Sequence, residues 1–293
     1  MRLYEKAKKS GQWDPYGFDF YRDKQDWKEL GTRKRRQVLY YLAQFQGGEE
    51  AVTLDLLPLI HAVARSRPLE DQLYMTSFLF DEGRHVQFFR LWLDDVAESP
   101  SRLEAYQSPA WRRIFDEELP AAMNPLLEGH GAAAFARACV TYNLIVEGVL
   151  AQTGYHACFV TLSANDLFPA LRAGLTQIRR DESRHIAFGI YLLSRLVAEE
   201  PTAWGAIEER MRELLPLCLA TVEEGFAASS GTTPLGTTKE AMMEFVTRQF
   251  WRRFASLRRA CLGSTRPPPR GEEPSRQSAA AAIGAEHDES DRS

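Results

Sequence analysis

The sequence predicts an all-α protein, a bundle of long helices, and three observations support this fold class. Proline and glycine residues gather at the two ends of the chain and in a few short joints, while the segments between them repeat apolar residues at helical spacing. With 293 residues and 44% hydrophobic content, the chain can bury one sizeable core. The word DEGRH at residues 81–85 returns as DESRH at residues 181–185, each time inside an apolar stretch.

Breaks between the apolar runs define the expected elements. Residues 1–31, which include Pro15 and Gly17, are expected to form an extended N-terminal arm, and the helical domain is expected to follow at residues 32–262. The SAND segment, residues 163–166, is the expected cap of the helix after it. The predicted helices cover residues 32–64, 69–96, 101–127, 132–162, 166–199 and 201–228, followed by a last one that ends near Cys261.

The end of the chain has a different composition. Residues 263–293 contain three consecutive prolines, many charged residues and no Phe, Trp or Tyr. Such a segment cannot bury enough apolar surface to fold, so we expect a disordered tail.

Charge and composition exclude several classes of function. Lys and Arg number 36 against 40 Asp and Glu, so no broad cationic surface is expected to hold a nucleic acid. No run reaches the ~18 consecutive apolar residues of a transmembrane helix. The four cysteines form no CxxC pair, and the N-terminus lacks the apolar run of a secretory signal, which favours a cytoplasmic location.

The two repeated words place polar residues on apolar helix faces. In the first, Glu82 and His85 continue a stripe of apolar residues at alternating steps of three and four, and Glu182 and His185 do the same in the second. A buried carboxylate or imidazole without a partner costs several kcal/mol. Each helix must therefore find a partner for its Glu and His inside the bundle.

A matching Glu-bearing segment precedes each word. Glu49 lies in LAQFQGGEEAV and Glu147 in YNLIVEGVL, both on apolar helical segments. The chain thus has two halves with one plan, a Glu followed by Glu-x-x-His. Four helices that each provide a Glu, two of them adding a His three positions later, are the ligand set of a carboxylate-bridged dinuclear metal site. The predicted metal ligands are Glu49, Glu82, His85, Glu147, Glu182 and His185.

The charges of this set favour two divalent ions. Four glutamates contribute about −4 and two such ions +4, whereas the same carboxylates without metal would repel each other. Oxygen donors combined with two imidazoles suit iron and manganese better than zinc or copper. Asp81 and Asp181, which precede two of the ligands, are expected to hold the free N–H of the His on the opposite helix.

The six predicted ligands resemble those of the ferritin-like superfamily of dimetal-carboxylate proteins. The narrower likeness is to the R2-like ligand-binding oxidases, relatives of the ribonucleotide reductase small subunit. It rests on GEEAV, VTYNLIVEG, TGY and EEGF at residues 48–52, 140–148, 153–155 and 223–226, and it extends from about Trp13 to Phe254. This resemblance implies a ferritin-like helical bundle with a four-helix dimetal core plus additional helices, and a homodimer.

The same resemblance implies a cofactor and a chemistry. The family uses one Mn and one Fe per chain, with a di-iron pair as a variant, to activate O2, and a long-chain fatty acid bridges the metals. Oxygen activation leaves an ether crosslink, which by motif would join the β-carbon of Val52 to the phenolic oxygen of Tyr142. Tyr155 is expected to hydrogen-bond the site or to line the ligand pocket.

Helical geometry explains one crosslink partner and not the other. Val52 follows Glu49 by three residues and so faces the same side of its helix. Tyr142 precedes Glu147 by five residues, about 140° away on a regular helix, so spacing alone does not select it. A local π-bulge would bring Tyr142 to the metal side.

Two other functions share parts of this pattern. A ribonucleotide reductase small subunit has the same metal set, but it usually carries a radical-bearing tyrosine four residues after the first His, where this chain has Phe89. Such a subunit also docks through apolar anchors in its tail, whereas this chain ends in EHDESDRS. A ferritin-like iron-oxidising or storage protein needs no organic substrate, but it is usually much shorter.

Overall fold

A computed structural model describes residues 2–98, 103–129, 131–227, 229 and 231–263 of the chain, and in these ranges the secondary structure is helical apart from one isolated bridge between Thr232 and Thr238. The predicted all-α fold is confirmed. The α-helices are α1 (Arg2–Ser10), α2 (Tyr21–Glu29), α3 (Thr32–Ser66), α4 (Leu69–Trp92), α5 (Pro109–Arg112), α6 (Leu119–Met123), α7 (Ala132–Cys139), α8 (Gln152–Ala164), α9 (Pro169–Glu199), α10 (Ala203–Gly225) and α11 (Lys239–Gly263).

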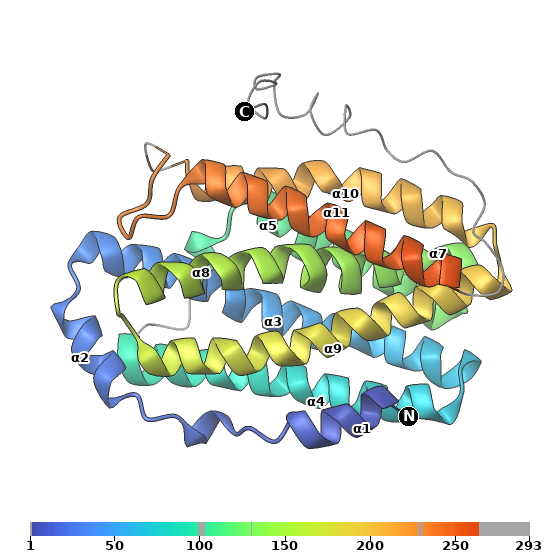
Figure 1. Cartoon of the computed structure of the whole chain (residues 1–293), viewed down its shortest axis with the longest axis horizontal. Helices are drawn as coiled ribbons and strands as arrows, with labels where there is room; N and C mark the ends of the chain where they lie inside the picture. The colour runs from blue at the N-terminus through green and yellow to red at the C-terminus, as the bar shows by residue number, and fades with distance from the viewer. Residues whose placement is uncertain (1, 99–102, 130, 228, 230, 264–293) are drawn as a thin grey trace, which may run out of the picture.

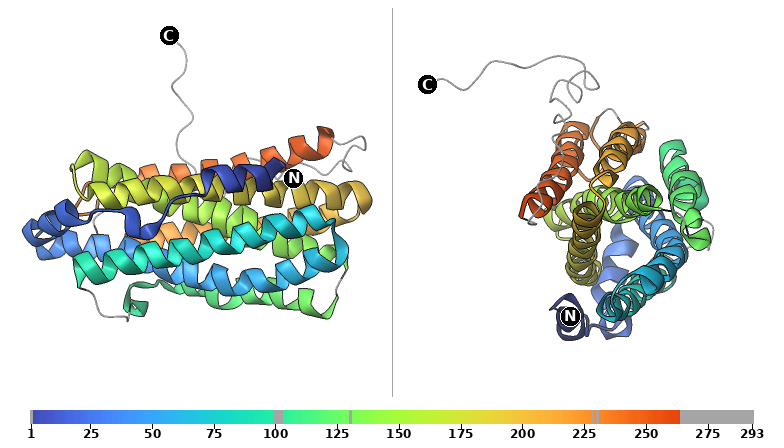
Figure 2. Two further views of the ribbon diagram at one scale, coloured as in Figure 1. Left: turned by 90° about the horizontal axis from the view of Figure 1, so that it is seen from below. Right: turned by 90° about the vertical axis from the view of Figure 1, so that its right-hand side faces the viewer.

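The long helices form a bundle along one axis. Figure 1 shows α3, α4, α8 and α9 running side by side, with α10 and α11 packed along one side of them. Seen along the axis, α10 and α11 lie on one side of the bundle, and α4 and the N-terminal segment lie on the other (Figure 2). Buried apolar side chains fill the interior in two clusters, one around Phe78 and Tyr142 and the other around Phe89 and Tyr155.

The helix from α7 to α8 changes its winding in the middle. A π-helical segment, η6 (Val140–Ala151), joins the two α-helices without a break. The whole stretch Ala132–Ala164 is long and apolar enough to cross a membrane, but 78% of its most apolar window is buried in the bundle. It is therefore the central core helix, and the expected helix over 132–162 is confirmed with a π-helical interior.

The segment expected as a single helix over 101–127 is broken. Its described part contains a 3-10 turn, η3 (Glu104–Tyr106), then α5, a π-helical turn η4 (Arg113–Glu118), α6 and another 3-10 turn, η5 (Asn124–Glu128). Three prolines lie in this stretch, and each lacks the N–H that a continuous helix requires. Shorter deviations occur at the end of α4, where a π-helical turn η2 (Leu93–Ala97) follows.

The N-terminal segment is not extended as expected. It forms α1 and α2, joined by a 3-10 turn, η1 (Pro15–Gly17), and it packs along α4 and α9. Asp23 on α2 accepts hydrogen bonds from the backbone N–H groups of Ala170 and Leu171 at 3.0 and 2.9 Å. These two groups belong to the first turn of α9 and have no partner within that helix. The cap of α9 therefore comes from α2 and not from the SAND segment.

The tail was predicted at residues 263–293; Gly263 is instead the last residue of α11, and residues 264–293 lie outside the described residues. The last helix, α11, ends at Gly263, two residues beyond the expected Cys261.

Candidate metal centre and its pocket

The bundle brings the six predicted ligand residues together from four helical segments. Glu49 comes from α3, Glu82 and His85 from α4, Glu147 from η6, and Glu182 and His185 from α9. Their ligand atoms form two groups, in each of which every atom lies within 4.8 Å of the others. Glu82 belongs to both groups, so two ions held by these groups would be adjacent and would share the Glu82 carboxylate. The groups are Glu49, Glu82, His85 and Glu182, and Glu82, Glu147 and His185.

Both imidazole rings face the carboxylates through Nδ1. This nitrogen of His85 lies 3.4 Å from an oxygen of each of Glu49, Glu82 and Glu182. The Nδ1 atom of His185 lies 3.1 Å from Glu82, 3.6 Å from Glu147 and 3.8 Å from Glu182. Two ligands of one ion, each bound at ~2.0–2.2 Å, are separated by comparable distances. Glu182 therefore lies between the two rings, as Glu82 does.

The chemistry of these atoms fits a pair of metal ions. All six residues are buried, with at most 4% of any of them exposed. Within the described part of the chain, several of their atoms have no hydrogen-bond partner, namely Oε1 of Glu82, Nδ1 of His85, Oε1 of Glu147, Oε2 of Glu182 and Nδ1 of His185. A buried polar atom without a partner costs about 1–3 kcal/mol. Two divalent ions would satisfy all five atoms at once.

Burial and mutual repulsion perturb the ionisation of the cluster. Burial raises the pKa of Glu49 to about 8 and that of Glu147 well above its ordinary value. Burial also acts to raise the pKa of Glu82, but the two imidazoles outweigh it and the pKa lies below the ordinary value. Four adjacent carboxylates thus cannot all carry their charge without cations.

Each His is held from behind by the Asp of the other repeated word. His85 Nε2 lies 3.3 Å from Asp181 Oδ2, and His185 Nε2 lies 3.2 Å from Asp81 Oδ2. The predicted cross-helix contacts are confirmed. A carboxylate at this position fixes the ring orientation and leaves Nδ1 free to act as a ligand.

Arginine residues join the two Asp side chains into one network. Arg184 donates to Asp81 at 2.9 Å and to Asp181 at 2.5 Å, while Arg84 donates to Asp81. Sequence reasoning did not identify these arginines, although the signal was present, since Arg is the fourth residue of both words. The two guanidinium groups balance the charge of the two carboxylates.

The N-terminal segment covers one side of this network. The indole N–H of Trp13 donates to Asp181 at 2.8 Å, and its ring is stacked 6.1 Å from that of His85. Burial acts to raise the pKa of Asp181, but the contacts with His85, Arg184 and Trp13 lower it to about 2. No sequence pattern pointed to Trp13, because 168 residues separate it from Asp181.

The two residues of the expected crosslink lie against each other. The hydroxyl of Tyr142 donates to the backbone oxygen of Val52 at 3.0 Å, and both side chains are buried. Tyr142 and Glu147 both lie in η6, where hydrogen bonds link residues five apart, so residues at that spacing are one turn apart on the same side. The helix is π-helical here, and this winding places Tyr142 on the same side of its helix as Glu147.

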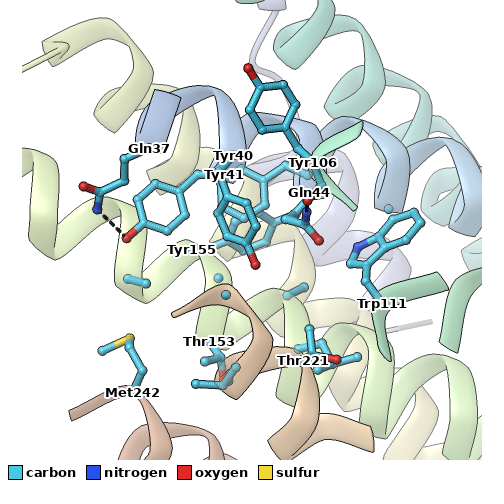
Figure 3. Close-up of a pocket in the computed structure, with 18 of the residues that line it drawn as sticks. Gln37, Tyr40, Tyr41, Gln44, Tyr106, Trp111, Thr153, Tyr155, Thr221 and Met242 are labelled. Carbon is cyan, nitrogen blue, oxygen red and sulfur yellow. Dashed lines mark hydrogen bonds between the residues drawn. The ribbon is translucent and has the colours of Figure 1, made fainter. Parts of the chain in front are cut away.

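A pocket of about 590 Å³ borders the cluster and extends along α3 to Arg33. Figure 3 shows ten of its lining residues with labels, among them Tyr41 and Tyr155. Its inner end is lined by Glu49, Glu147, Glu182 and Val52, and its outer end by Arg33. The sixteen residues from Arg33 to Glu49 correspond to about 24 Å along the helix axis. Tyr155 was expected to hydrogen-bond the site or to line the ligand pocket. It lines this pocket, and its hydroxyl also donates a hydrogen bond to Glu49.

Comparisons with known proteins agree with this arrangement. Residues 1–258 match the family model of the ribonucleotide reductase small chain. Among solved structures, an R2-like ligand-binding oxidase with a Tyr-to-Phe substitution and an anaerobically reconstituted Mn/Fe cofactor is 37% identical, with a TM-score of 0.82, and the match covers 87% of this chain and 92% of the other. Two further variants of an R2-like ligand-binding oxidase, both aerobically reconstituted with Mn/Fe, are each 36% identical over 87% of this chain and 92% of the other. Their TM-scores are 0.83 for a Val-to-Ile variant and 0.84 for a Tyr-to-Phe variant.

The match to the family model spans most of the chain, and the matched structures contain a Mn/Fe cofactor, for which this chain has a fitting group of buried carboxylates and imidazoles. The helical bundle is accordingly ferritin-like. The chain therefore belongs to the ribonucleotide reductase small-chain family, within it to the R2-like ligand-binding oxidases, and it is a dinuclear metal oxidoreductase.

Proposed function

We propose that the protein is an Mn/Fe oxidase that activates O2 for two-electron oxidation, binds a long-chain fatty acid at its metal centre and joins Val52 to Tyr142 through an ether bond. The single observation that carries this proposal is the contact between the Tyr142 hydroxyl and the backbone of Val52, 3.0 Å apart, beside the six buried candidate ligands.

The six residues would hold one Mn and one Fe, as the cofactor of the similar oxidases suggests. When bound, such a pair supplies the oxidising power for a two-electron oxidation with O2 as the electron acceptor. The protein orients the two histidine rings and keeps water away from the metal centre. Asp81 and Asp181 orient the rings, and the side chain of Phe78 lies flat on His185, with 3.7 Å between ring centroids, so water is kept from that side.

The crosslink is balanced as a loss of two hydrogen atoms. The tertiary C–H bond of Val52 and the O–H bond of Tyr142 break, one C–O bond forms, and two electrons and two protons pass to O2. Burial raises the pKa of Tyr142 well above its ordinary value, so the phenol keeps its proton until the reaction. The Val52 carbonyl accepts the hydrogen bond of that phenol and holds its oxygen beside residue 52.

The pocket supports a long ligand with a carboxylate at its inner end. The three glutamates at that end are candidate metal ligands, so a carboxylate that reaches them would also reach the metals. Beyond them the walls are largely apolar and include Phe45, Phe115 and Val146. A largely apolar pocket whose lining follows about 24 Å of α3 suits an acyl chain.

We also propose a cytoplasmic homodimer. Apolar side chains are exposed on two helices that pack together, Leu54 and Leu57 on α3 and Leu69 and Phe80 on α4. Side chains of this kind would form part of an association surface where they make a contiguous patch. The four cysteines are free and buried, which agrees with a reducing compartment. Size-exclusion chromatography with light scattering tests the dimer, and a monomeric mass would contradict it.

The test of the oxidase is metal analysis and intact mass of protein made metal-free and then loaded with Mn(II) and Fe(II) under oxygen. We expect roughly one Mn and one Fe per chain and the loss of two hydrogen atoms, mapped to peptides containing Val52 and Tyr142. Tyr142→Phe should bind both metals without the mass change. Tyr191→Phe, which alters a half-buried tyrosine on α9 outside the candidate site, is the matched control and should behave like the wild type.

Other outcomes discriminate between the alternatives. Bound iron without the mass change would refute the crosslink and favour a reductase small subunit or an iron-oxidising protein. The absence of bound metal would refute the proposed function as a whole.

A further inference from the structure

The π-helical segment η6 receives hydrogen bonds from arginine side chains of two neighbouring helices. α11 runs along the helix that contains η6 (Figure 1). From α11, Nε of Arg253 donates to the backbone oxygen of Gly148 at 2.8 Å. From α10, Nε of Arg210 donates to the hydroxyl of Thr141 at 2.9 Å. Thr141 lies at the start of the segment and Gly148 towards its end, so η6 is held from outside at both places.

The Gly148 carbonyl lies close to the point where the winding returns to that of an α-helix. In a regular α-helix this carbonyl would accept from the N–H of Gln152, but that N–H donates to the backbone oxygen of Val149. When hydrogen bonds pass from a spacing of five residues to a spacing of four, one carbonyl near the junction is passed over. A buried carbonyl requires a donor, and Arg253 supplies one to Gly148 from outside the helix.

The aliphatic part of Arg253 packs directly on the same turn. A β-carbon at residue 148 would lie 3.1 Å from both Cγ and Cδ of Arg253 and 3.0 Å from the backbone oxygen of Asn143. The glycine thus allows the arginine to approach the backbone closely. Gly148 directly follows the candidate ligand Glu147 and comes six residues after Tyr142, so this contact lies within the stretch that presents both side chains.

Arg253 is a half-buried cation whose partners are neutral. Besides the Gly148 carbonyl it contacts the side-chain oxygen of Gln249, to which it donates at 3.2 Å, and among the described residues no carboxylate pairs with it. Burial, together with the neighbouring Arg252, lowers the pKa of Arg253 to about 10, so the guanidinium is charged at neutral pH. A charged donor binds a carbonyl more strongly than a neutral one does. The cost of burying this charge is therefore offset by contacts that include η6 and not by an ion pair.

We propose that Arg253 is a positioning residue, whose hydrogen bond to Gly148 holds the end of η6 in its π-helical winding and so keeps Tyr142 against Val52. If the segment wound as a regular α-helix, Tyr142 and Glu147 would point about 140° apart. The part of this inference that concerns the ether bond rests on the proposed function. The part that concerns the winding depends only on the contacts of η6.

Two substitutions separate the hydrogen bond from the packing. Arg253→Met keeps an unbranched side chain but removes the donor, whereas Arg253→Lys keeps a charged donor. Each protein is made metal-free, loaded with Mn(II) and Fe(II) and exposed once to O2, and the crosslinked fraction of the chains that carry both metals is read from intact mass. Losing one hydrogen bond from a charged group should lower this fraction by about 10-fold in Arg253→Met, and Arg253→Lys should restore most of it.

Hydrogen–deuterium exchange provides a readout that does not depend on the reaction. Peptides from η6 should exchange about 10-fold faster in Arg253→Met than in the wild type, while peptides from α4 and α9 should be unchanged. Arg248→Met is the matched control, because it removes an exposed arginine of the same helix that pairs with Glu244. It should behave like the wild type in both measurements.

Three results would overturn the inference. One is wild-type crosslinking and exchange in Arg253→Met, and another is an equal loss in Arg253→Met and Arg253→Lys, since packing and not the hydrogen bond would then hold the segment. The third is faster exchange throughout the bundle, because Arg253 would then support the whole fold. A wild type that binds both metals and forms no crosslink would instead refute the proposed function, and the exchange of η6 would then decide whether Arg253 holds the winding.

Discussion

The two halves of the bundle provide the same candidate metal ligands through helices that differ in winding. In the first half, Glu49 stands on a regular α-helix and Val52 follows on the same face. In the second half, the helix around Glu147 is π-helical, and only this winding brings Tyr142 to the metal side. The comparison shows that metal binding can be nearly symmetric while the proposed crosslink depends on an asymmetry of the backbone.

One position shortly after each repeated word shows how the bundle accommodates the π-helical segment. Four residues after the His, the first half has Phe89 and the second has Gly189. A β-carbon at Gly189 would lie 2.2 Å from the β-carbon of Asn143, a residue of η6 that donates to Glu147 at 3.2 Å. The π-helical segment thus approaches α9 more closely than a side chain at 189 would permit.

The largest expected effect is a loss of bound metal, and it should be greater when the residue common to both candidate ligand groups is changed than when a residue of one group is changed. Glu82→Gln should reduce bound metal from about two ions per chain to less than about one, because Glu82 belongs to both ligand groups, whereas Glu49→Gln should leave about one. Elemental analysis after loading and desalting measures both. Glu50→Gln, which changes the exposed neighbour of Glu49, is the control, and equal losses in Glu49→Gln and Glu82→Gln would contradict the shared position.

Replacing either Asp residue behind the histidines should weaken metal binding, and the size of the effect should differ between the two. Asp81→Asn and Asp181→Asn should each weaken metal binding by about 10- to 100-fold, because the carboxylate that orients each ring is lost. We expect the larger loss for Asp181→Asn, since Asp181 also accepts from Trp13. Competition with a metal-sensitive chelator gives the affinities, and unchanged affinity in both variants would show that the rings need no such support.

A smaller effect tests the fit between α9 and the π-helical segment. Gly189→Ala should destabilise the protein by about 1–3 kcal/mol through overpacking against Asn143, and it should reduce the yield of the crosslink because Glu147 and Tyr142 lie in the same segment. Urea unfolding and intact mass measure the two effects. A variant with wild-type stability and crosslink would show that the close approach is dispensable.

The smallest expected effect lies inside the words themselves, where Gly83 in the first corresponds to Ser183 in the second. No atom lies within 4 Å of a β-carbon built at Gly83, so Gly83→Ala should stabilise the protein by about 0.5–1 kcal/mol through helix propensity. The same urea titration measures this change. A loss of stability would show that residue 83 does not tolerate a side chain, although residue 183, its counterpart in the second word, is a serine.

The grouping of the six candidate ligands and the long helices were predictable because both depend on local spacing. Apolar periodicity located α4 and α9, and the Glu-x-x-His spacing placed both ligands of each word on one face. The cross-helix contacts of Asp81 and Asp181 followed from the same repeat.

The remaining features depend on contacts between distant residues or on winding. Residues 1–31 contain no long apolar stripe, so the helices α1 and α2, which pack against α4 and α9, were not recognised. A π-helical segment differs from an α-helix in its hydrogen bonds and not in its composition, and the sequence showed only that Tyr142 would need it. The pocket requires the packed structure, because α3, η6 and α10 each form part of its wall.

The cap that α2 places on α9 has a consequence for how the chain folds. Asp23 and Leu171 are 148 residues apart, so closing this contact requires a large loss of chain entropy. During synthesis the N-terminal segment leaves the ribosome long before α9 exists, and its buried aspartates have no amide groups to bind until then. We therefore expect the segment to dock late, after the bundle has assembled, and to act as the final closure over the side of the site that contains Trp13.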